Sequence, residues 1–334
     1  MKRWIIVILA LLLAACGSAR QSLPTPNGND IQLSGGAYAD YTITVSGTAQ
    51  DPIVVYGNGS TLRCVLITGS YIVWRDTTVR GCDTFGIRVK GAHNQIINNV
   101  VTDVVRRNWD GAKCGGSGSW DRGISVSLAT DILVSGNLVF RVCGEGIGVL
   151  MSSDVIVENN IVYDTFSVNL YPDNSNNVII RNNRAYSTGD TRYYRDGKPA
   201  RGLLIGAESY AGWGFQVHDL LVEGNTFERS RGISYYAEVT GTPSNVIVRN
   251  NHFVNVTAPL VSLGSWAKVS GNVSVTPTPG GTAVTLTPTV TATITPTPTA
   301  SATPVPATST PTATATPSEE CIYFPLHDQW VCLK

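Results

Sequence analysis

Alternating apolar and polar positions recur along the chain from about residue 70 to residue 275. Each copy contains two or three alternating apolar residues, a polar pair, an asparagine and a further apolar stretch. Residues 154–160 (DVIVENN) and 177–183 (NVIIRNN) are two examples. The copies recur with a base period near 22 to 23 residues, with longer spacings in two places. A fixed period of this length indicates a repeat architecture built from short strands.

A second strand is expected nine residues after the asparagine of each copy. It begins with glycine and alternates thereafter, as in residues 86–89 (GIRV) and 146–149 (GIGV). Because side chains alternate between the two faces of a strand, Ile87 and Val89 should point inward and Arg88 outward. Two or three short strands in each turn predict an all-β, single-stranded parallel β-helix over residues 31–275. A leucine-rich repeat has a similar period, but the branched residues here are valine and isoleucine.

The recurring asparagine has a structural explanation. Asparagine tolerates a tight turn, and its amide can bond to the backbone of neighbouring coils. Stacking of identical amides from coil to coil forms a ladder. We therefore expect the asparagine column to hold the coils together and not to form a binding site.

The N-terminus has the pattern of an export signal. Lys2 and Arg3 precede an apolar stretch, residues 4–13, that is too short to span a bilayer comfortably. Small residues before Cys16 resemble the bacterial lipobox, in which the cysteine becomes the lipidated first residue. We expect residues 1–15 to be a signal peptide and the protein to be exported, facing the outside of the cytoplasmic membrane or the cell surface. An ordinary cleaved signal peptide or a short anchor helix remains the alternative.

Two low-complexity stretches flank the repeats. Residues 16–30 are small and polar and read as a tether. Residues 276–317 form an uncharged Thr/Pro/Ala tract that cannot build a core and favours extended polyproline II structure. Residues 318–334 form a short tail, in which Cys321 and Cys332 should close a disulfide around aromatic residues.

Charge and cysteine content narrow the possible partners. Lys plus Arg and Asp plus Glu both number 24, so the net charge of +0 argues against nucleic acid as a partner. The cysteine count of 7 is odd, and lipidation of Cys16 leaves an even number for disulfides in an oxidising compartment. The pairing of the other four, Cys64, Cys82, Cys114 and Cys143, stays open. We expect a monomer without a resident metal or cofactor.

Residues 35–275 resemble the right-handed parallel β-helix proteins of the pectate-lyase-like superfamily. The opening stretches 36–48 (GAYADYTITVSGT) and 52–57 (PIVVYG) are similar to the first coils of secreted members. The resemblance implies a right-handed coil. It also implies a protein that cleaves, epimerises or binds acidic polysaccharides, or one that only displays a surface. The family motifs Asn-Thr-Asp, Asp-Asp, Gly-His-Gly and Asp-Pro-His are absent, so the resemblance assigns no catalytic residue. Because lyases of the family often use calcium, Ca²⁺ is a possible cofactor.

Two insertions indicate where a site would form. Nine residues normally separate the asparagine from the next glycine, but the longer segments Asn99 to Gly123 and Asn183 to Gly202 leave the solenoid at the same corner, three coils apart. Insertions carry function on repeat scaffolds because the coils are committed to stacking. We therefore expect a groove walled by residues 104–120 and 188–200. Cys114 could pin the first wall to Cys143 on the floor.

The side chains expected around this groove suit a uronate. Arginine forks bind carboxylates, and β-elimination needs that carboxylate neutralised, a base at C5 and an acid at the leaving oxygen. The expected catalytic residues are the arginines Arg122 and Arg201 for neutralisation, Tyr171, Tyr194 and Lys198 as base or acid, and Glu145, which would orient an arginine or bind calcium with Asp173. The expected substrate-binding residues are Trp109, Lys113, Tyr193, Arg195, Glu208, Trp213 and Tyr236.

Three functions remain open from the sequence. The leading function is that of a surface lipoprotein that binds an acidic polysaccharide and, if it is an enzyme, cleaves it. A polysaccharide lyase is then favoured over a glycoside hydrolase, because a hydrolase needs two suitably spaced carboxylates. A non-catalytic glycan-binding or adhesive protein is the second. A structural cell-envelope protein is the third.

Overall fold

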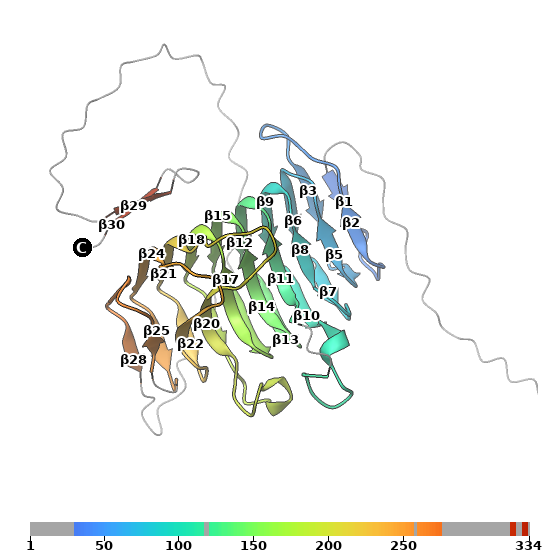
Figure 1. Cartoon of the computed structure of the whole chain (residues 1–334). Helices are drawn as coiled ribbons and strands as arrows, with labels where there is room; N and C mark the ends of the chain where they lie inside the picture. Colours follow the sequence, from blue (N-terminus) through green and yellow to red (C-terminus); the bar gives the residue numbers. More distant parts are fainter. Residues whose placement is uncertain (1–29, 117–119, 257–258, 276–320, 325–328, 333–334) are drawn as a thin grey trace, which may run out of the picture.

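The computed structural model describes residues 30–116, 120–256, 259–275, 321–324 and 329–332. Three parallel sheets wind into a solenoid whose coils each contribute one strand to every sheet (Figure 1). The predicted parallel β-helix is confirmed. The predicted signal peptide and the Thr/Pro linker lie outside the described residues, as does the tether apart from Asp30. Within the described part of the chain, no helix is long and apolar enough to cross a membrane.

The strands of each sheet pair in chain order, one coil apart. The first sheet contains β1 (Asp30–Gln32), β3 (Ile53–Tyr56), β6 (Ile72–Arg75), β9 (Ala92–Ile97), β12 (Thr130–Ser135), β15 (Ser153–Glu158), β18 (Asn176–Arg181), β21 (His218–Glu223), β24 (Ser244–Arg249) and β27 (Ala267–Ser270). The second contains β4 (Thr61–Leu62), β7 (Thr78–Arg80), β10 (Val100–Val104), β13 (Leu138–Val142), β16 (Ile161–Thr165), β19 (Arg184–Tyr186), β22 (Thr226–Glu228), β25 (His252–Val254) and β28 (Val273–Val275).

The third sheet carries the residues predicted for the groove floor. It contains β2 (Tyr41–Ile43), β5 (Val65–Ile67), β8 (Ile87–Val89), β11 (Arg122–Ser127), β14 (Glu145–Leu150), β17 (Val168–Asp173), β20 (Arg201–Ala207), β23 (Ile233–Ala237) and β26 (Val261–Ser262). Two short 3-10 helices, η1 (Arg106–Asn108) and η2 (Thr191–Tyr193), lie in the two insertions. A separate antiparallel pair is formed by β29 (Cys321–Phe324) and β30 (Gln329–Cys332).

Apolar side chains fill the solenoid in columns. On the third sheet Ile124, Ile147 and Leu170 are register partners on adjacent strands, and all three are buried. Alternate positions of each strand therefore point inward, as the period of two required. Burial of these columns stabilises the fold by roughly 25 cal/mol for each Å² of apolar surface removed from water.

The asparagine column forms the expected ladder. The side-chain oxygen of Asn160 accepts the backbone N–H of Asn137 at 2.9 Å, and its amide nitrogen donates to the Val134 carbonyl at 2.9 Å and to the Asn183 oxygen at 3.0 Å. Asn160 is 1% exposed, so these bonds satisfy polar groups that water cannot reach. The structural interpretation of the column is confirmed.

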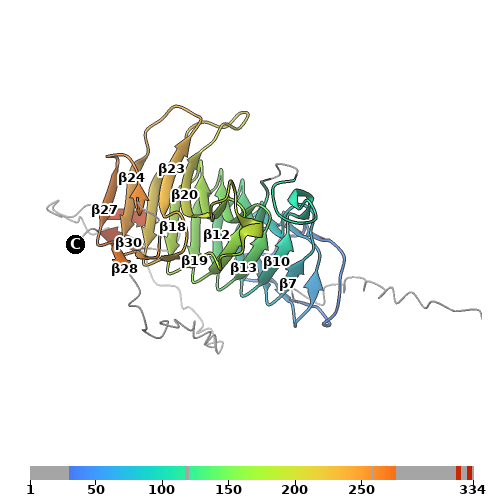
Figure 2. The same cartoon turned by 90° about the horizontal axis from the view of Figure 1, so that it is seen from below.

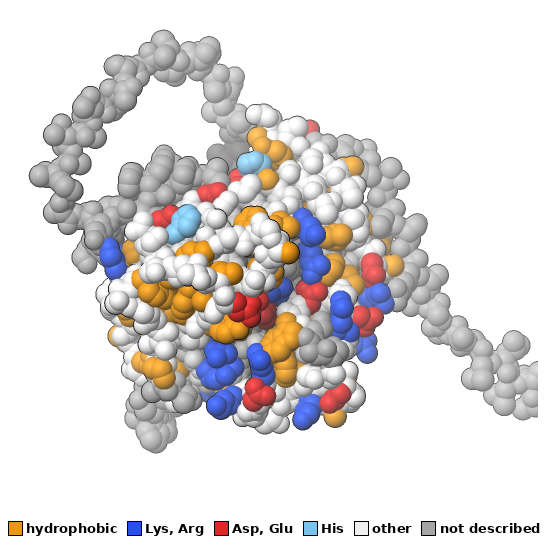
Figure 3. Space-filling model, viewed as in Figure 1, with side chains coloured by type: hydrophobic (Ala, Val, Ile, Leu, Met, Phe, Trp, Pro, Cys, Tyr) orange, Lys and Arg blue, Asp and Glu red, His pale blue; other side chains and the backbone are white. Residues whose placement is uncertain are grey.

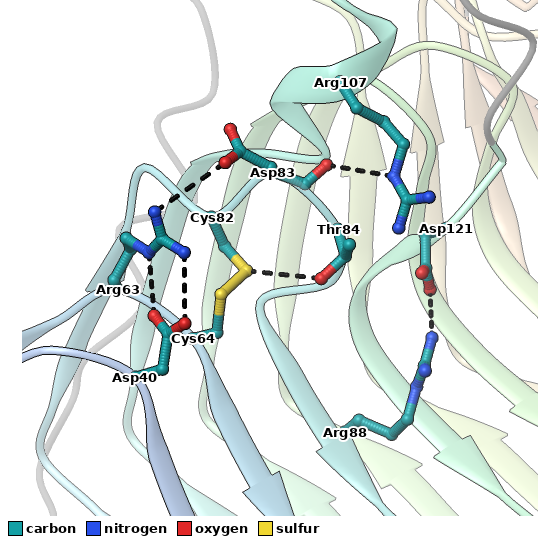
Figure 4. Close-up of a disulfide and its surroundings, with 9 residues drawn as sticks. All are labelled: Asp40, Arg63, Cys64, Cys82, Asp83, Thr84, Arg88, Arg107 and Asp121. Atoms are coloured by element: carbon teal, nitrogen blue, oxygen red, sulfur yellow. Dashed lines mark hydrogen bonds and ion pairs between the residues drawn. A yellow bond between two sulfur atoms is a disulfide. The ribbon is translucent and has the colours of Figure 1, made fainter.

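Disulfides join neighbouring coils. Cys114 bonds to Cys143, as considered from the sequence, and Cys64 bonds to Cys82, a pairing that the sequence left open. Figure 4 shows the second bond beside the exposed ion pair of Arg63 with Asp40. Backbone pairing places Cys321 opposite Cys332, but the predicted disulfide between them lies outside the described side chains.

The two insertions are in contact with each other. Both project from the same edge of the solenoid (Figures 1 and 2), as predicted. However, the backbone N–H of Cys114 donates to the carbonyl of Arg192 at 2.9 Å. The sequence did not indicate whether the two predicted walls touch, and in the structure they are in contact at this point. Each insertion satisfies backbone groups of the other, and together they close one side of a hollow on the third sheet.

Candidate functional site

A hollow of about 520 Å³ lies on the outward face of the third sheet. We call it the central hollow. Figure 3 shows acidic, basic and apolar side chains gathered on this face. The lining residues come from the strands, the two insertions and the loop 208–216: Trp120, Arg122, Glu145, Ser167, Val168, Tyr171, Arg195, Asp196, Arg201, Leu204, Glu208, Arg231, Tyr235 and Tyr236.

Two glycines make room for large polar side chains on this floor. A Cβ atom at Gly148 would lie 2.4 Å from Cδ of Arg122, and one at Gly206 would lie 2.6 Å from the hydroxyl of Tyr171. Any other residue would displace these groups, since real Cβ atoms do not approach so closely. Gly148 lies in β14 and Gly206 in β20, and both face outward. The alternation of side chains along each strand therefore leaves space above these two glycines, and the side chains of Arg122 and Tyr171 occupy it.

The side chains of Arg122 and Glu145 are in contact at one end of the hollow, where Glu145 is buried and Arg122 is partly buried. They are register partners on β11 and β14, and the guanidinium Nε lies 2.6 Å from the carboxylate Oε2. Burial raises the pKa of Glu145 to about 8, and Asp173 and Glu208 add to the effect, whereas Arg122 opposes it. A carboxyl group with this pKa retains its proton near neutral pH, which suits a general acid.

A tyrosine in the loop 208–216 joins two carboxylates. The hydroxyl of Tyr210 lies 2.5 Å from Oδ2 of Asp173 and 3.0 Å from Oε2 of Glu208. A phenol has one hydrogen and can donate to only one of them. Burial raises the pKa of Asp173, although the bonds from Tyr210 and from the Glu208 backbone lower it. The three groups are therefore arranged to share a proton beside the hollow.

Tyr171 lies on the floor of the hollow with its hydroxyl buried and close to the carboxylate of Glu208. Burial raises the pKa of Tyr171, and the nearby carboxylates of Asp173 and Glu145 add to the effect. A phenolate is strongly disfavoured in this setting. Tyr171 is therefore suited to donate a hydrogen bond or a proton and unsuited to act as a base.

Three arginines form the basic end of the hollow. Burial and the neighbouring Arg201 and Arg195 lower the pKa of Arg231 to about 10. Its Nε and Nη2 atoms are buried and have no hydrogen-bond partner in the described structure. Burial, followed by Arg195, also lowers the pKa of Arg201. Arg195 lies 3.7 Å from Asp196, so Arg201 and Arg231 are the two arginines without a carboxylate at ion-pair distance in the described structure, and this excess of positive charge favours an anionic ligand.

Aromatic side chains border the arginines. The guanidinium of Arg195 stacks 3.8 Å from the ring centre of Trp120 and donates to Oγ of Ser167 at 3.3 Å. These contacts hold Arg195 over the hollow, since guanidinium groups are attracted to the faces of aromatic rings. Tyr236 lines the opposite side and is 46% exposed, which leaves its ring available to a ligand.

The structure brings part of the predicted site together. The central hollow contains Arg122, Glu145, Tyr171, Arg195, Arg201, Glu208 and Tyr236. Sequence reasoning did not assign Tyr210, Trp120 or Arg231 to the site. Arg231 follows the same column as Arg201 in the repeat, which was an available signal. Tyr210 and Trp120 lie in insertions, where no periodicity indicates how a side chain points.

The remaining predicted residues lie elsewhere. Lys198 is exposed and lines a neighbouring hollow that shares Arg201 and Arg231 with the central one. The hydroxyl of Tyr194 accepts a 3.5 Å bond from Ser187, and Lys113 is exposed on its loop. The others line separate hollows: Trp109 and Tyr193 beside the second sheet, and Trp213 near Lys90 and Leu128. Their roles in binding stay predictions, but they do not share one groove.

Metal ligands were considered because calcium was a possible cofactor. In the described ranges, no three His, Cys, Asp or Glu side chains converge in a way that could hold a metal ion. Glu145 and Asp173 both interact with neighbouring groups, Arg122 and Tyr210. The calcium expectation is not tested by this arrangement.

Comparisons with known proteins place the fold. The family model described as right handed beta helix region matches residues 41–199. Pectate lyase Pel9A is 14% identical, with a TM-score of 0.47, over 73% of this chain and 70% of that one. An alginate lyase from Paenibacillus sp. str. FPU-7 is 16% identical, with a TM-score of 0.35, over 73% and 90%. A tailspike protein mutant of E. coli bacteriophage HK620, in complex with a pentasaccharide, is 14% identical, with a TM-score of 0.41, over 75% and 51%.

No curated protein matches the chain. With identities under 25% and TM-scores under 0.5, these solved structures assign this chain no activity. The strand topology shows the fold directly, because each coil adds one parallel strand to each of three sheets. The observed topology is a parallel β-helix, and a right handed beta helix region is matched over residues 41–199, so the fold is the one that the resemblance to the pectate-lyase-like superfamily implied.

Proposed function

We propose that the protein binds an acidic polysaccharide in the central hollow and cleaves it by β-elimination. The observation that carries the proposal is the pair of Arg201 and Arg231, which have no carboxylate at ion-pair distance among the described residues and include buried N–H groups without partners, whereas the adjacent Arg195 lies 3.7 Å from Asp196. Unsatisfied charged donors are costly in a folded protein. A uronate carboxylate would supply the missing acceptor.

The reaction needs groups with opposite tasks on either side of the scissile bond. The arginines neutralise the C6 carboxylate, which makes the C5 proton more acidic. Glu208 is only partly buried in the hollow and takes this proton. As the C5–H and C4–O bonds break and a C4–C5 double bond forms, Glu145 gives its proton to the leaving oxygen. Tyr210 contacts both Glu208 and Asp173, so the proton that Glu208 takes is shared within this cluster before it is lost to water, and Glu145 regains its own proton from water.

The proposal includes attachment to a membrane. Lipidation of Cys16 would hold the solenoid close to the bilayer through the 16–30 tether, and the 276–317 tract would carry the tail outward. Incorporation of labelled palmitate, and its loss in Cys16→Ser, tests this part separately.

The test of the activity is a panel of uronate polysaccharides incubated with the protein, with calcium or with a chelator. Lyase action generates unsaturated sugar ends that absorb ultraviolet light. We expect product from at least one polysaccharide, and at least a hundredfold loss in Arg201→Glu, because the carboxylate would meet a repelling charge. Arg229→Glu is the matched control, since Arg229 lies one coil further on, does not line the hollow and pairs with Glu228.

The outcomes separate two functions. Binding that Arg201→Glu abolishes, without any product, would assign the protein to the non-catalytic glycan binders. Absence of both binding and product across the panel would refute the proposal. Equal losses in Arg201→Glu and Arg229→Glu would show that overall charge, and not the hollow, governs the interaction.

A further inference from the structure

A second hollow, of about 370 Å³, lies where strands of the second sheet end and the two insertions begin. We call it the insertion hollow. It shares no lining residue with the central hollow. Its lining includes four arginines, Arg80, Arg106, Arg141 and Arg192. The repeat does not explain this gathering, because Arg106 and Arg192 belong to different insertions.

The charges in the insertion hollow are not balanced. Asp103 is shared, since its carboxylate lies 3.0 Å from Nε of Arg80 and 3.2 Å from Nε of Arg141. Arg192 pairs with Asp190 at 2.6 Å. Within the described residues, Arg106 has no carboxylate at ion-pair distance. Two of the four guanidinium charges are therefore uncompensated, and the hollow is electropositive.

The geometry of this hollow is fixed before any ligand arrives. The Cys114–Cys143 disulfide and the bond from the Cys114 N–H to the Arg192 carbonyl tie the two insertions to the solenoid and to each other. The rings of Trp109 and Tyr193, one from each insertion, lie 6.1 Å apart and line the same hollow. Preorganised donors bind more tightly because they lose less conformational freedom on association.

We propose that the insertion hollow binds a phosphorylated sugar. The phosphate monoester would lie among the arginines, and the sugar ring would contact Trp109. A phosphate monoester carries about 1.5 to 2 negative charges at pH 7, which matches the two uncompensated guanidinium charges better than the single charge of a uronate does. Arginine forks bind phosphate oxygens in pairs. The half-buried indole of Trp109 supplies apolar area beside them.

The test is calorimetric titration of the full-length protein, purified in detergent at low salt, with glucose 6-phosphate. We expect saturable binding with one site per chain. Inorganic phosphate should bind about tenfold more weakly because it lacks the ring, glucuronate should also bind more weakly because it carries less charge, and glucose should not bind. Binding should weaken as salt is added, since the site is partly exposed.

Two neighbouring arginines provide a matched pair of variants. Arg106→Ala removes a lining guanidinium that makes no ion pair among the described residues, and it should weaken binding at least tenfold. Arg107→Ala removes the same charge one residue away, where the side chain is exposed and does not line the hollow, and it should leave binding unchanged. Arg201→Glu should also have no effect, because Arg201 belongs to the central hollow.

Three results would overturn this inference. If glucose 6-phosphate does not bind the unmodified protein, the proposed site does not exist. Equal losses in Arg106→Ala and Arg107→Ala would show a diffuse charge effect. Loss of binding in Arg201→Glu, with Arg106→Ala unaffected, would move the phosphate to the central hollow. None of these results depends on whether the central hollow is catalytic.

Discussion

Replacement of Glu145 by glutamine should change how the stability of the protein depends on pH. Burial raises the pKa of Glu145 from 4.5 to about 8 in the folded protein. The folded state therefore holds a proton that the unfolded state releases. A group of this kind stabilises the fold fully below pH 4.5, and its contribution is lost as the pH rises to about 8. At about 1.4 kcal/mol for each pH unit, the loss across this window reaches about 5 kcal/mol.

The assay is urea unfolding of the wild-type protein and Glu145→Gln at several pH values from 4 to 9. The difference in free energy of unfolding between the two proteins should shift by several kcal/mol in favour of the variant as the pH rises. Glu158→Gln is the control, because Glu158 also pairs with an arginine, Arg181, at 2.7 Å but stays partly exposed. Parallel pH curves for the wild-type protein and Glu145→Gln would refute the reasoning, since Glu145 would then ionise as freely in the folded state as in the unfolded state.

Three further predictions concern the scaffold of the site. Gly148→Ala should retain the fold but weaken polysaccharide binding at least tenfold in a titration. The reason is that the added methyl group displaces the Arg122 side chain. Unchanged binding would contradict the role given to this glycine. Cys114→Ser should lower the free energy of unfolding by about 3–4 kcal/mol, measured with urea, because the bond to Cys143 closes a loop with a sequence separation of 29; an unchanged free energy of unfolding would contradict this stabilising role. Asn160→Ala should cost about 3 kcal/mol in the same assay, because buried N–H and C=O groups in adjacent coils lose their partners; a cost below 1 kcal/mol would argue against the ladder.

The fold was predictable because the repeat acts on every coil. The spacing of Asn137, Asn160 and Asn183 gave the coil length, and alternation in stretches such as residues 146–149 gave the inward face. The pairing of Arg122 with Glu145 on adjacent strands followed from the constant number of residues between each asparagine and the next glycine. Periodicity succeeds here because each strand pairs only with its neighbours, so local pattern and global structure agree.

The site was predictable only where it follows the columns. Arg122, Glu145 and Arg201 occupy repeat positions, and the structure confirms that they share one face of the third sheet. Tyr210 and Trp109 come from insertions, whose course depends on contacts that no period encodes. A segment that leaves the solenoid returns wherever its own backbone and side-chain partners permit, and this is why the sequence did not indicate whether the two insertions touch.

The join between the two insertions also affects cooperativity. Stability in a solenoid is ordinarily a chain of nearest-neighbour terms, so coils can open one after another from an end. The bond from the Cys114 N–H to the Arg192 carbonyl connects a segment leaving β10 to a segment entering β20, and so bypasses the coils of β13 and β16. Opening any coil within this span requires the connection to break. The middle of the solenoid should therefore exchange its amide hydrogens as one unit, while coils outside the span exchange separately.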